Sequence, residues 1–312
     1  MLKEKIIQRR PGILTYGITP PKAGEPVEKI REIAVRQVER IKGLPIDALI
    51  LYDIQDEKER VSAARPFPFM KTLDPALYSR DYLSGLSMPH IIYRCVGKYP
   101  PEELAYWVES SREKSLYSVF VGAASKSQTV TMSLSQAYEL VPHGDEHFLL
   151  GGVAIPERHL TKKDEHLRVF QKMEQGCRYF ISQAVYNVEA SKNFLSDYYF
   201  YCQEQEVPMA PIVLTLTPCG SLKTLQFMKW LGVNIPRWLE NELVHSRDIL
   251  DRSTQLSIKA FTELMQFGAE KKIPIGCNVE SVSINKVEIE ASIQLVKEIS
   301  RLMTSQYKVD QD

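Results

Sequence analysis

The stretch Arg178-Tyr-Phe-Ile-Ser-Gln-Ala-Val-Tyr-Asn187 decides the fold prediction, because it is a short apolar run between two helical patterns. Gly176 ends the helical pattern before it and Val188 begins the next one, so the run predicts a buried strand between two helices. In a parallel α/β fold, ligands bind at the carboxyl ends of such strands. We therefore expect Gln183, near the end of the strand, to face a bound ligand.

Strand-like and helix-like stretches alternate outward from this run to both ends of the chain, which indicates βα units and a parallel sheet. A doubly wound open sheet is the alternative, but its first strand normally leads into a glycine-rich phosphate turn, and this chain has Thr19-Pro20-Pro21 there. We therefore predict an α/β fold in which residues 1–312 form a single (β/α)8 TIM barrel with extra C-terminal helices. The seven other predicted strands are residues 13–18, 48–52, 90–94, 117–121, 148–154, 211–216 and 275–279.

Bulk composition limits the classes of partner. The chain has 39 Lys and Arg residues and 39 Asp and Glu residues, so its net charge of zero gives no reason to expect nucleic acid or an anionic membrane. No segment approaches the roughly 18–20 uninterrupted apolar residues of a membrane span, and no export signal follows Met1. The five cysteines are scattered singly, which fits reduced thiols and predicts no metal site. We expect a cytoplasmic protein, with self-association into a homo-oligomer left open.

Residues at the ends of the predicted strands should converge at one face of the barrel. They provide carboxylates, hydroxyls, an amide and an imidazole, but no Ser in a nucleophile-elbow context. The set consists of Thr19, Asp53, Asp56, Glu57, Tyr93, Arg94, Ser125, Glu157, His159, Gln183, Thr217, Glu280 and Ser281.

The order of several short motifs resembles the methylenetetrahydrofolate reductase family, whose barrels use a flavin to reduce a folate-bound methylene group to methyl. The resemblance extends from about Tyr16 to the last predicted helix, which is nearly the whole chain. It implies FAD as cofactor, NAD(P)H as reductant, a folate substrate, and a role in one-carbon metabolism and methionine biosynthesis. The motifs are Thr19-Pro20-Pro21-Lys22, Pro89-His90, Ile155-Pro-Glu-Arg-His159, Gly176 to Glu189, and Val233-Asn-Ile-Pro-Arg-Trp238.

The same resemblance implies roles for five residues. Gln183 matches a glutamine that contacts the folate pterin, whose edge of mixed donors and acceptors suits a side-chain amide. His90 and His159 match positions that line the flavin. Lys172 matches a lysine at the cofactor phosphates, and Glu165 stands where the family places a shorter carboxylate near the ribose.

Three departures from the family pattern bear on the chemistry. Gly17 replaces a glutamate that protonates the folate nitrogen when the methylene bridge opens, so Asp53, Glu280 or water would have to supply that proton. Gly122-Ala123-Ala124 replaces an Arg-Gly-Asp sequence, which removes a bidentate phosphate clamp. Ile155 replaces a tyrosine that stacks on the cofactor.

These matches and departures predict an oxidoreductase that transfers hydride from NAD(P)H, via FAD if it is bound, to 5,10-methylenetetrahydrofolate and forms 5-methyltetrahydrofolate. Two alternatives stay open: a flavin-independent, folate-dependent one-carbon enzyme, and a folate-binding protein without catalysis. The sequence does not distinguish NADH from NADPH.

Overall fold

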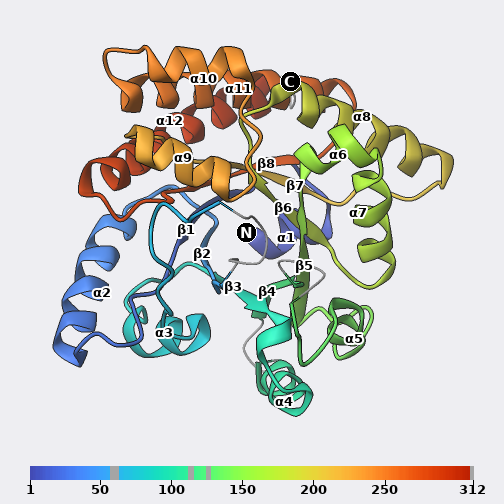
Figure 1. The fold of residues 1–312 in the computed structure, drawn as a ribbon. Coiled ribbons are helices and arrows are strands. Elements are labelled where there is room, and N and C mark those ends of the chain that lie inside the picture. Colours follow the sequence, from blue (N-terminus) through green and yellow to red (C-terminus); the bar gives the residue numbers. More distant parts are fainter. Residues whose placement is uncertain (57–62, 112–115, 124–127, 310–312) are drawn as a thin grey trace.

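Eight parallel strands close into a barrel in the computed structural model, which describes residues 1–56, 63–111, 116–123 and 128–309 (Figure 1). Each strand pairs with the next one in the sequence, and the last, β8 (Ile275–Glu280), pairs with the first, β1 (Leu14–Ile18). The predicted (β/α)8 fold is therefore confirmed. The other strands are β2 (Ala48–Leu51), β3 (His90–Cys95), β4 (Leu116–Val121), β5 (Phe148–Ala154), β6 (Tyr179–Ala184) and β7 (Ile212–Leu216).

Helices surround the barrel and connect its strands (Figure 1). Every predicted strand is present, because alternation of buried runs with helical periods identifies βα units reliably. Seven have ends within about one residue of the prediction, whereas the run 178–187 forms a strand only over Tyr179–Ala184. The helices are α1 (Leu2–Ile7), α2 (Val27–Ile41), α3 (Pro75–Tyr82), α4 (Pro101–Ser111), α5 (Leu134–Glu139), α6 (Pro156–Lys162), α7 (Glu165–Glu174), α8 (Val188–Glu204), α9 (Leu222–Trp230), α10 (Arg237–Val244), α11 (Ile249–Glu270) and α12 (Lys286–Val309), with a 3₁₀ turn, η2, at Val96–Lys98.

One stretch predicted as a single helix is covered by the end of one helix and by a second helix. The sequence pattern predicts a helix from about residue 162 to 175, whereas the structure has α6 before that point and α7 within it. Lys163 has a left-handed backbone conformation (φ 51°), which ends α6. Helix α7 then begins at Glu165, directly after Asp164. The break allows two helices of different direction to cover the carboxyl end of β5.

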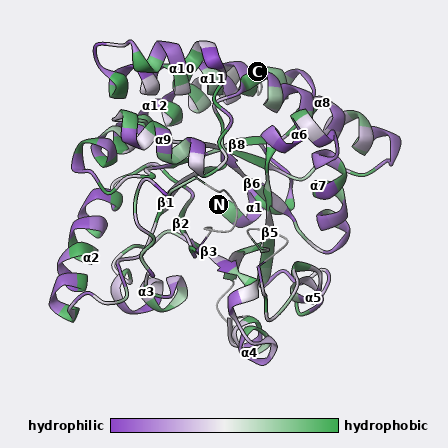
Figure 2. Cartoon of the chain, in the orientation of Figure 1, coloured by the Kyte–Doolittle hydropathy of each residue, from purple (hydrophilic) through white to green (hydrophobic). Residues whose placement is uncertain are grey.

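The core has two layers, one between the strands and the outer helices and one inside the barrel. Figure 2 shows hydrophilic and hydrophobic residues alternating along outer helices such as α2, which buries Ile30, Ala34 and Ile41. The inner layer includes Leu2 and Ile6 of α1, both at most 2% exposed. Helix α1 therefore closes the amino-terminal end of the barrel, and ligand access is left to the opposite end. Within the described residues, no helix combines the length and the apolar character needed to cross a membrane.

Candidate functional site

A cavity of about 2080 Å³ lies at the carboxyl-terminal end of the barrel. Its walls come from the ends of six strands and from loops and helices beside them, and its volume exceeds the roughly 300–1,000 Å³ of most small-molecule sites. The predicted strand-end residues that line it are Thr19, Asp53, Tyr93, Gln183, Glu280 and Ser281. The residues of that set that do not line it are Asp56, Arg94, Glu157, His159 and Thr217, while Glu57 and Ser125 lie outside the described residues.

Gln183 faces this cavity from β6, where the register of β6 against β7 shifts. The Ser182 hydroxyl accepts a hydrogen bond from the Thr215 backbone N–H (2.9 Å), and the Thr215 hydroxyl donates to the Ser182 carbonyl (2.6 Å), so the irregular backbone is held in place. The Gln183 side-chain nitrogen donates to the Leu231 carbonyl (2.8 Å). Because a carbonyl only accepts, this bond fixes the amide orientation. The Gln183 Oε1 atom is then buried with no hydrogen-bond partner among the described residues.

A carboxyl group and two tyrosines lie on the part of the wall that runs from β8 through β1 and the end of β2 to β3. Glu280 of β8 lies beside Gly17 of β1 in the strand register, and both line the cavity. A Cβ atom on Gly17 would lie 2.6 Å from Cε2 of Tyr52, so the Tyr52 ring fills the space that a side chain at position 17 would need. The Tyr52 hydroxyl accepts a hydrogen bond from Asn278 (2.9 Å), and its ring packs edge-on against Tyr93, with centroids 4.8 Å apart.

The environment of Glu280 keeps about half of this carboxyl protonated at pH 7. Burial raises its pKa to about 7, and contact with the Tyr52 hydroxyl offsets only part of that effect. Glu280 has no ion pair among the described residues. It therefore offers a proton in the cavity at a pH where an ordinary carboxyl has none.

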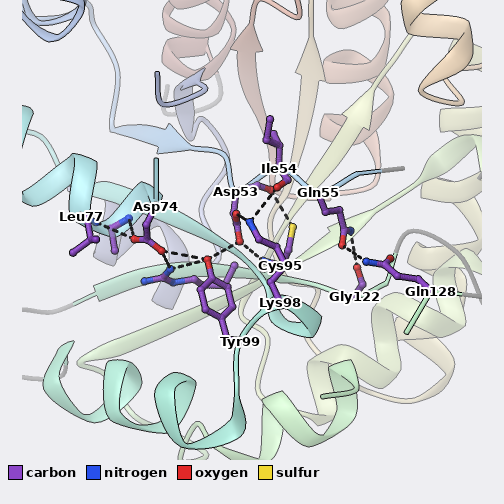
Figure 3. A network of polar contacts seen from close by, with 12 residues as sticks. Asp53, Ile54, Gln55, Asp74, Leu77, Cys95, Lys98, Tyr99, Gly122 and Gln128 are labelled. Atoms are coloured by element: carbon purple, nitrogen blue, oxygen red, sulfur yellow. Dashed lines mark hydrogen bonds and ion pairs between the residues drawn. The ribbon is translucent and has the colours of Figure 1, made fainter. Parts of the chain in front are cut away.

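Asp53, the other carboxyl predicted to act as an acid, contacts three groups of the protein itself (Figure 3). Its Oδ2 atom accepts hydrogen bonds from the Cys95 backbone N–H (2.8 Å) and the Tyr99 hydroxyl (2.9 Å), and its Oδ1 atom pairs with the Lys98 ammonium. The Asp53 side chain is only 2% exposed. Both oxygen atoms of Asp53 are thus occupied by partners within the protein, and little of the side chain is open to a ligand.

The loop that departs from the family pattern after β4 is tied to the loop after β2 (Figure 3). The Gln55 side-chain nitrogen donates to the Gly122 carbonyl (3.1 Å), and Gln128 donates to the Gln55 amide oxygen (3.2 Å). Ala124 lies outside the described residues. Amides rather than a guanidinium therefore occupy this edge of the cavity.

Lys172 lines the cavity from α7, while Glu165 lies behind the wall. The Lys172 ammonium donates to the Val153 carbonyl (2.6 Å). Burial lowers the pKa of Lys172, and attraction to Glu165 opposes that change. Glu165 is fully buried, accepts a hydrogen bond from the Ile155 backbone N–H (2.8 Å) and faces Arg158 across 3.2 Å. The two residues share one face of α7, as their spacing predicts, but only Lys172 can reach a ligand.

A sequence profile of methylenetetrahydrofolate reductase matches residues 123–296, which is more than half of the chain. This chain belongs to the methylenetetrahydrofolate reductase family. It is also similar to a solved structure of an uncharacterized protein from Clostridium thermocellum, described as binding two copies of 5-methyl-5,6,7,8-tetrahydrofolic acid. The two share 54% sequence identity with a TM-score of 0.86, over 97% of this chain and 100% of that one.

Other solved barrels are far less similar. Dihydropteroate synthase from Thermus thermophilus shares 12% identity at a TM-score of 0.47, over 95% of this chain and 94% of that one. 2,3-Dimethylmalate lyase shares 13% identity at a TM-score of 0.41, over 99% and 96%. No curated protein sequence matches the chain.

The two histidines that the methylenetetrahydrofolate reductase resemblance assigns to the flavin do not line the cavity. His90 is the first residue of β3, at the amino-terminal end of the barrel, where its Nδ1 atom contacts the Ser79 hydroxyl (2.6 Å) and burial lowers its pKa to about 4. His159 is 3% exposed and bonds Asp197 of α8 (2.9 Å). His159, His166 and Asp197 form a group whose potential metal-ligand atoms lie within 4.8 Å of one another. The assignment of His90 and His159 to a cofactor stays a prediction.

The resemblance points to Gln183 and Lys172 and the strand-end rule points to Glu280, and all three line the cavity. Two features of the site have no such signal in the sequence. Tyr52 follows a strand without any motif around it, yet its ring fills the space above Gly17. The Leu231 carbonyl, which orients Gln183, is 48 residues away in the sequence and belongs to the backbone, so no residue type signals it.

Proposed function

We propose that this chain binds a reduced folate in the cavity, with the pterin ring against Gln183. The observation that carries the proposal is the buried Gln183 Oε1 atom, which has no partner among the described residues although its amide nitrogen is already bonded. An acceptor in this state costs free energy unless a ligand donates to it, and the amino and ring N–H groups of a pterin are suitable donors. The similar protein described as binding 5-methyltetrahydrofolic acid supports the same ligand.

We propose further that the bound folate is 5,10-methylenetetrahydrofolate and that it is reduced to 5-methyltetrahydrofolate. A hydride from NAD(P)H adds to the methylene carbon, the bond from that carbon to N10 breaks, and N10 takes up one proton. Glu280 supplies this proton in the proposal, because it lies beside Gly17 in the strand register, lines the cavity and, with its pKa raised to about 7, is about half protonated at pH 7. The product would serve one-carbon metabolism and methionine biosynthesis.

The fit of a flavin to this cavity is incomplete. Of the four residues that the resemblance assigns to FAD, only Lys172 lines the cavity, while His90, His159 and Glu165 do not. The residues present therefore do not fit an FAD held in that way. FAD binding stays a prediction that the absorption spectrum of the purified protein tests directly.

Calorimetry with 5-methyltetrahydrofolate tests the binding part of the proposal. Gln183→Ala should weaken binding about 10- to 100-fold, because a lost hydrogen bond to a desolvated group costs about 1–3 kcal/mol. Gln203→Ala, an exposed position on α8 outside the cavity, is the matched control and should bind like the wild type. Equal affinity in both variants would refute the role of Gln183.

Oxidation of NAD(P)H in the presence of 5,10-methylenetetrahydrofolate tests the reaction. A second function, folate binding without catalysis, is favoured by one specific observation: three of the four expected cofactor contacts do not reach the cavity. Tight folate binding without turnover, for either nicotinamide and with or without added FAD, would establish that second function and refute the reductase.

A further inference from the structure

One group of polar side chains on α6, α7 and α8 lies outside the cavity and has no role in the proposed function. It consists of His159 of α6, His166 of α7 and Asp197 of α8, and one potential ligand atom from each lies within 4.8 Å of the others. Figure 1 shows these three helices beside one another at one side of the barrel. The group therefore joins three neighbouring helices at one point.

The break between α6 and α7 brings the two histidines together. On one continuous helix, residues 159 and 166 would be separated by roughly 10 Å along the axis. Because α6 ends at the left-handed Lys163 and α7 begins anew, the ring centroids of His159 and His166 are instead 5.3 Å apart, in an edge-to-face arrangement. Asp197 comes from the helix that follows β6, so no spacing along the sequence signals the group.

Two imidazole nitrogen atoms of the group are buried without a partner. His159 is 3% exposed, and its Nδ1 atom has no hydrogen bond among the described residues. The Nδ1 atom of His166 is in the same state. Buried polar atoms are almost always satisfied, so two such atoms in contacting rings indicate a ligand that binds imidazole nitrogen. A metal ion is such a ligand, and histidine is the side chain that most often binds one.

Asp197 supplies the negative charge that a cation needs. Its Oδ2 atom lies 2.9 Å from the His159 Nε2 atom, and no Lys or Arg side chain pairs with it within 4 Å in the described part of the chain. Ligand atoms of a tetrahedral zinc ion are roughly 3.3 Å apart, so a small shift of either side chain makes room for an ion. The Asp197 side chain is 52% exposed, which lets water complete the coordination.

We propose that His159, His166 and Asp197 bind one divalent transition-metal ion such as Zn²⁺, at a structural site outside the cavity. Two imidazole nitrogens and one carboxylate oxygen suit such an ion, whereas Mg²⁺ and Ca²⁺ require mostly oxygen ligands. The ion connects α6, α7 and α8 and fixes the break between the first two. Both of these helices contribute side chains to the cavity wall, Lys162 and Lys172 among them. The proposal does not depend on folate binding.

Calorimetric titration of the full chain with Zn²⁺ tests the proposal, on protein that carries no histidine tag and has been freed of metal with a chelator. The wild type should bind one ion per chain, and Mg²⁺ should not compete. His166→Phe keeps an aromatic ring at the contact with Tyr201 (centroids 5.5 Å) but removes the nitrogen ligand. This variant and Asp197→Asn should each weaken Zn²⁺ binding at least about tenfold, because even residues that only support a metal ligand contribute about 10- to 100-fold to affinity. His245→Ala, at an exposed position after α10, is the matched control and should bind like the wild type.

Thermal denaturation gives a second readout. A metal ion that binds the folded chain and not the unfolded chain raises the melting temperature. Zn²⁺ should therefore raise the melting temperature of the wild type and of His245→Ala, and leave that of His166→Phe unchanged. If His159→Ala fails to fold because this imidazole is buried, His166→Phe and Asp197→Asn still decide the question, since both positions are partly open to solvent.

The remaining outcomes overturn the proposal. A wild type that binds no Zn²⁺, or binds it only as weakly as His166→Phe, would show that the three residues form an aromatic and hydrogen-bonded contact without a metal. Loss of Zn²⁺ binding in His245→Ala would assign the ion to another surface site. Folate binding is measured in a separate titration, and its absence would overturn the proposed function while leaving the metal site intact.

Discussion

Glu280→Gln should change how the stability of the protein depends on pH. Burial raises the pKa of Glu280 to about 7 from an ordinary value of 4.5, so between these two pH values the folded protein holds a proton that the unfolded chain has lost. The wild type therefore loses stability as the pH rises through this window. Each unit of pKa difference corresponds to about 1.4 kcal/mol, so the loss is at most about 3 kcal/mol. It will be smaller because the side chain is only partly buried.

Chemical denaturation followed by circular dichroism between about pH 5 and pH 8 measures this effect. Glutamine cannot ionise, so the free energy of unfolding of Glu280→Gln, relative to the wild type, should rise by about 1–3 kcal/mol across that range. Glu270→Gln, at an exposed position near the end of α11, is the control and should keep a constant difference. Parallel curves for Glu280→Gln and the wild type would refute the raised pKa.

The same variant tests the proposed proton transfer. If Glu280 supplies the proton, the wild-type rate should fall as the pH rises above about 7, because the carboxyl then loses its proton. Glu280→Gln should reduce the rate about 10²- to 10⁴-fold and remove that pH dependence. An active Glu280→Gln enzyme with an unchanged pH profile would exclude the role, whatever the stability data show.

Three further predictions concern stability and are measured by denaturation of single variants. Gly17→Ala should cost about 1–3 kcal/mol, because the new Cβ atom would lie 2.6 Å from the Tyr52 ring; an unaltered stability would mean that the ring moves freely. Asp53→Ala should cost about 2–4 kcal/mol, since it leaves the Lys98 ammonium and two other donors without their acceptor, and a cost below about 1 kcal/mol would contradict that account. Glu157→Gln should change stability little near pH 4 and increase it near pH 9, because burial raises the pKa of this carboxyl to about 8 from 4.5, so that between these pH values the folded wild type holds a proton that the unfolded chain has lost and its stability falls. A Glu157→Gln effect that is the same at both pH values would show that the carboxyl titrates normally.

The architecture could be predicted from the sequence because it depends on local patterns. Buried runs of four to seven residues alternate with amphipathic helices along the chain, and a closed parallel barrel is the arrangement that buries such runs on both faces. The break between α6 and α7 was not predicted, because it rests on the left-handed conformation of a single lysine, Lys163, which no residue-type rule favours.

The candidate site could be predicted only in part. The strand-end rule brought Gln183 and Glu280 to the correct face, because position along a parallel strand determines which end of the barrel a side chain reaches. The same rule predicts Asp53 and Glu280 equally as proton donors, and the sequence does not distinguish between them. Their difference lies in partners: Asp53 meets Lys98, 45 residues further along the chain, while Glu280 meets no cation among the described residues.

The sequence by itself therefore determined which residues are strands, which are helices and which side chains point toward the open end of the barrel, because periodicity and turn chemistry act over a few residues. Only the tertiary structure decided which of those side chains remain available to a ligand. Availability depends on groups distant in sequence: the Leu231 carbonyl orients Gln183, and the Tyr52 ring fills the space above Gly17. Closure of the barrel brings these groups together, and no local pattern records that convergence.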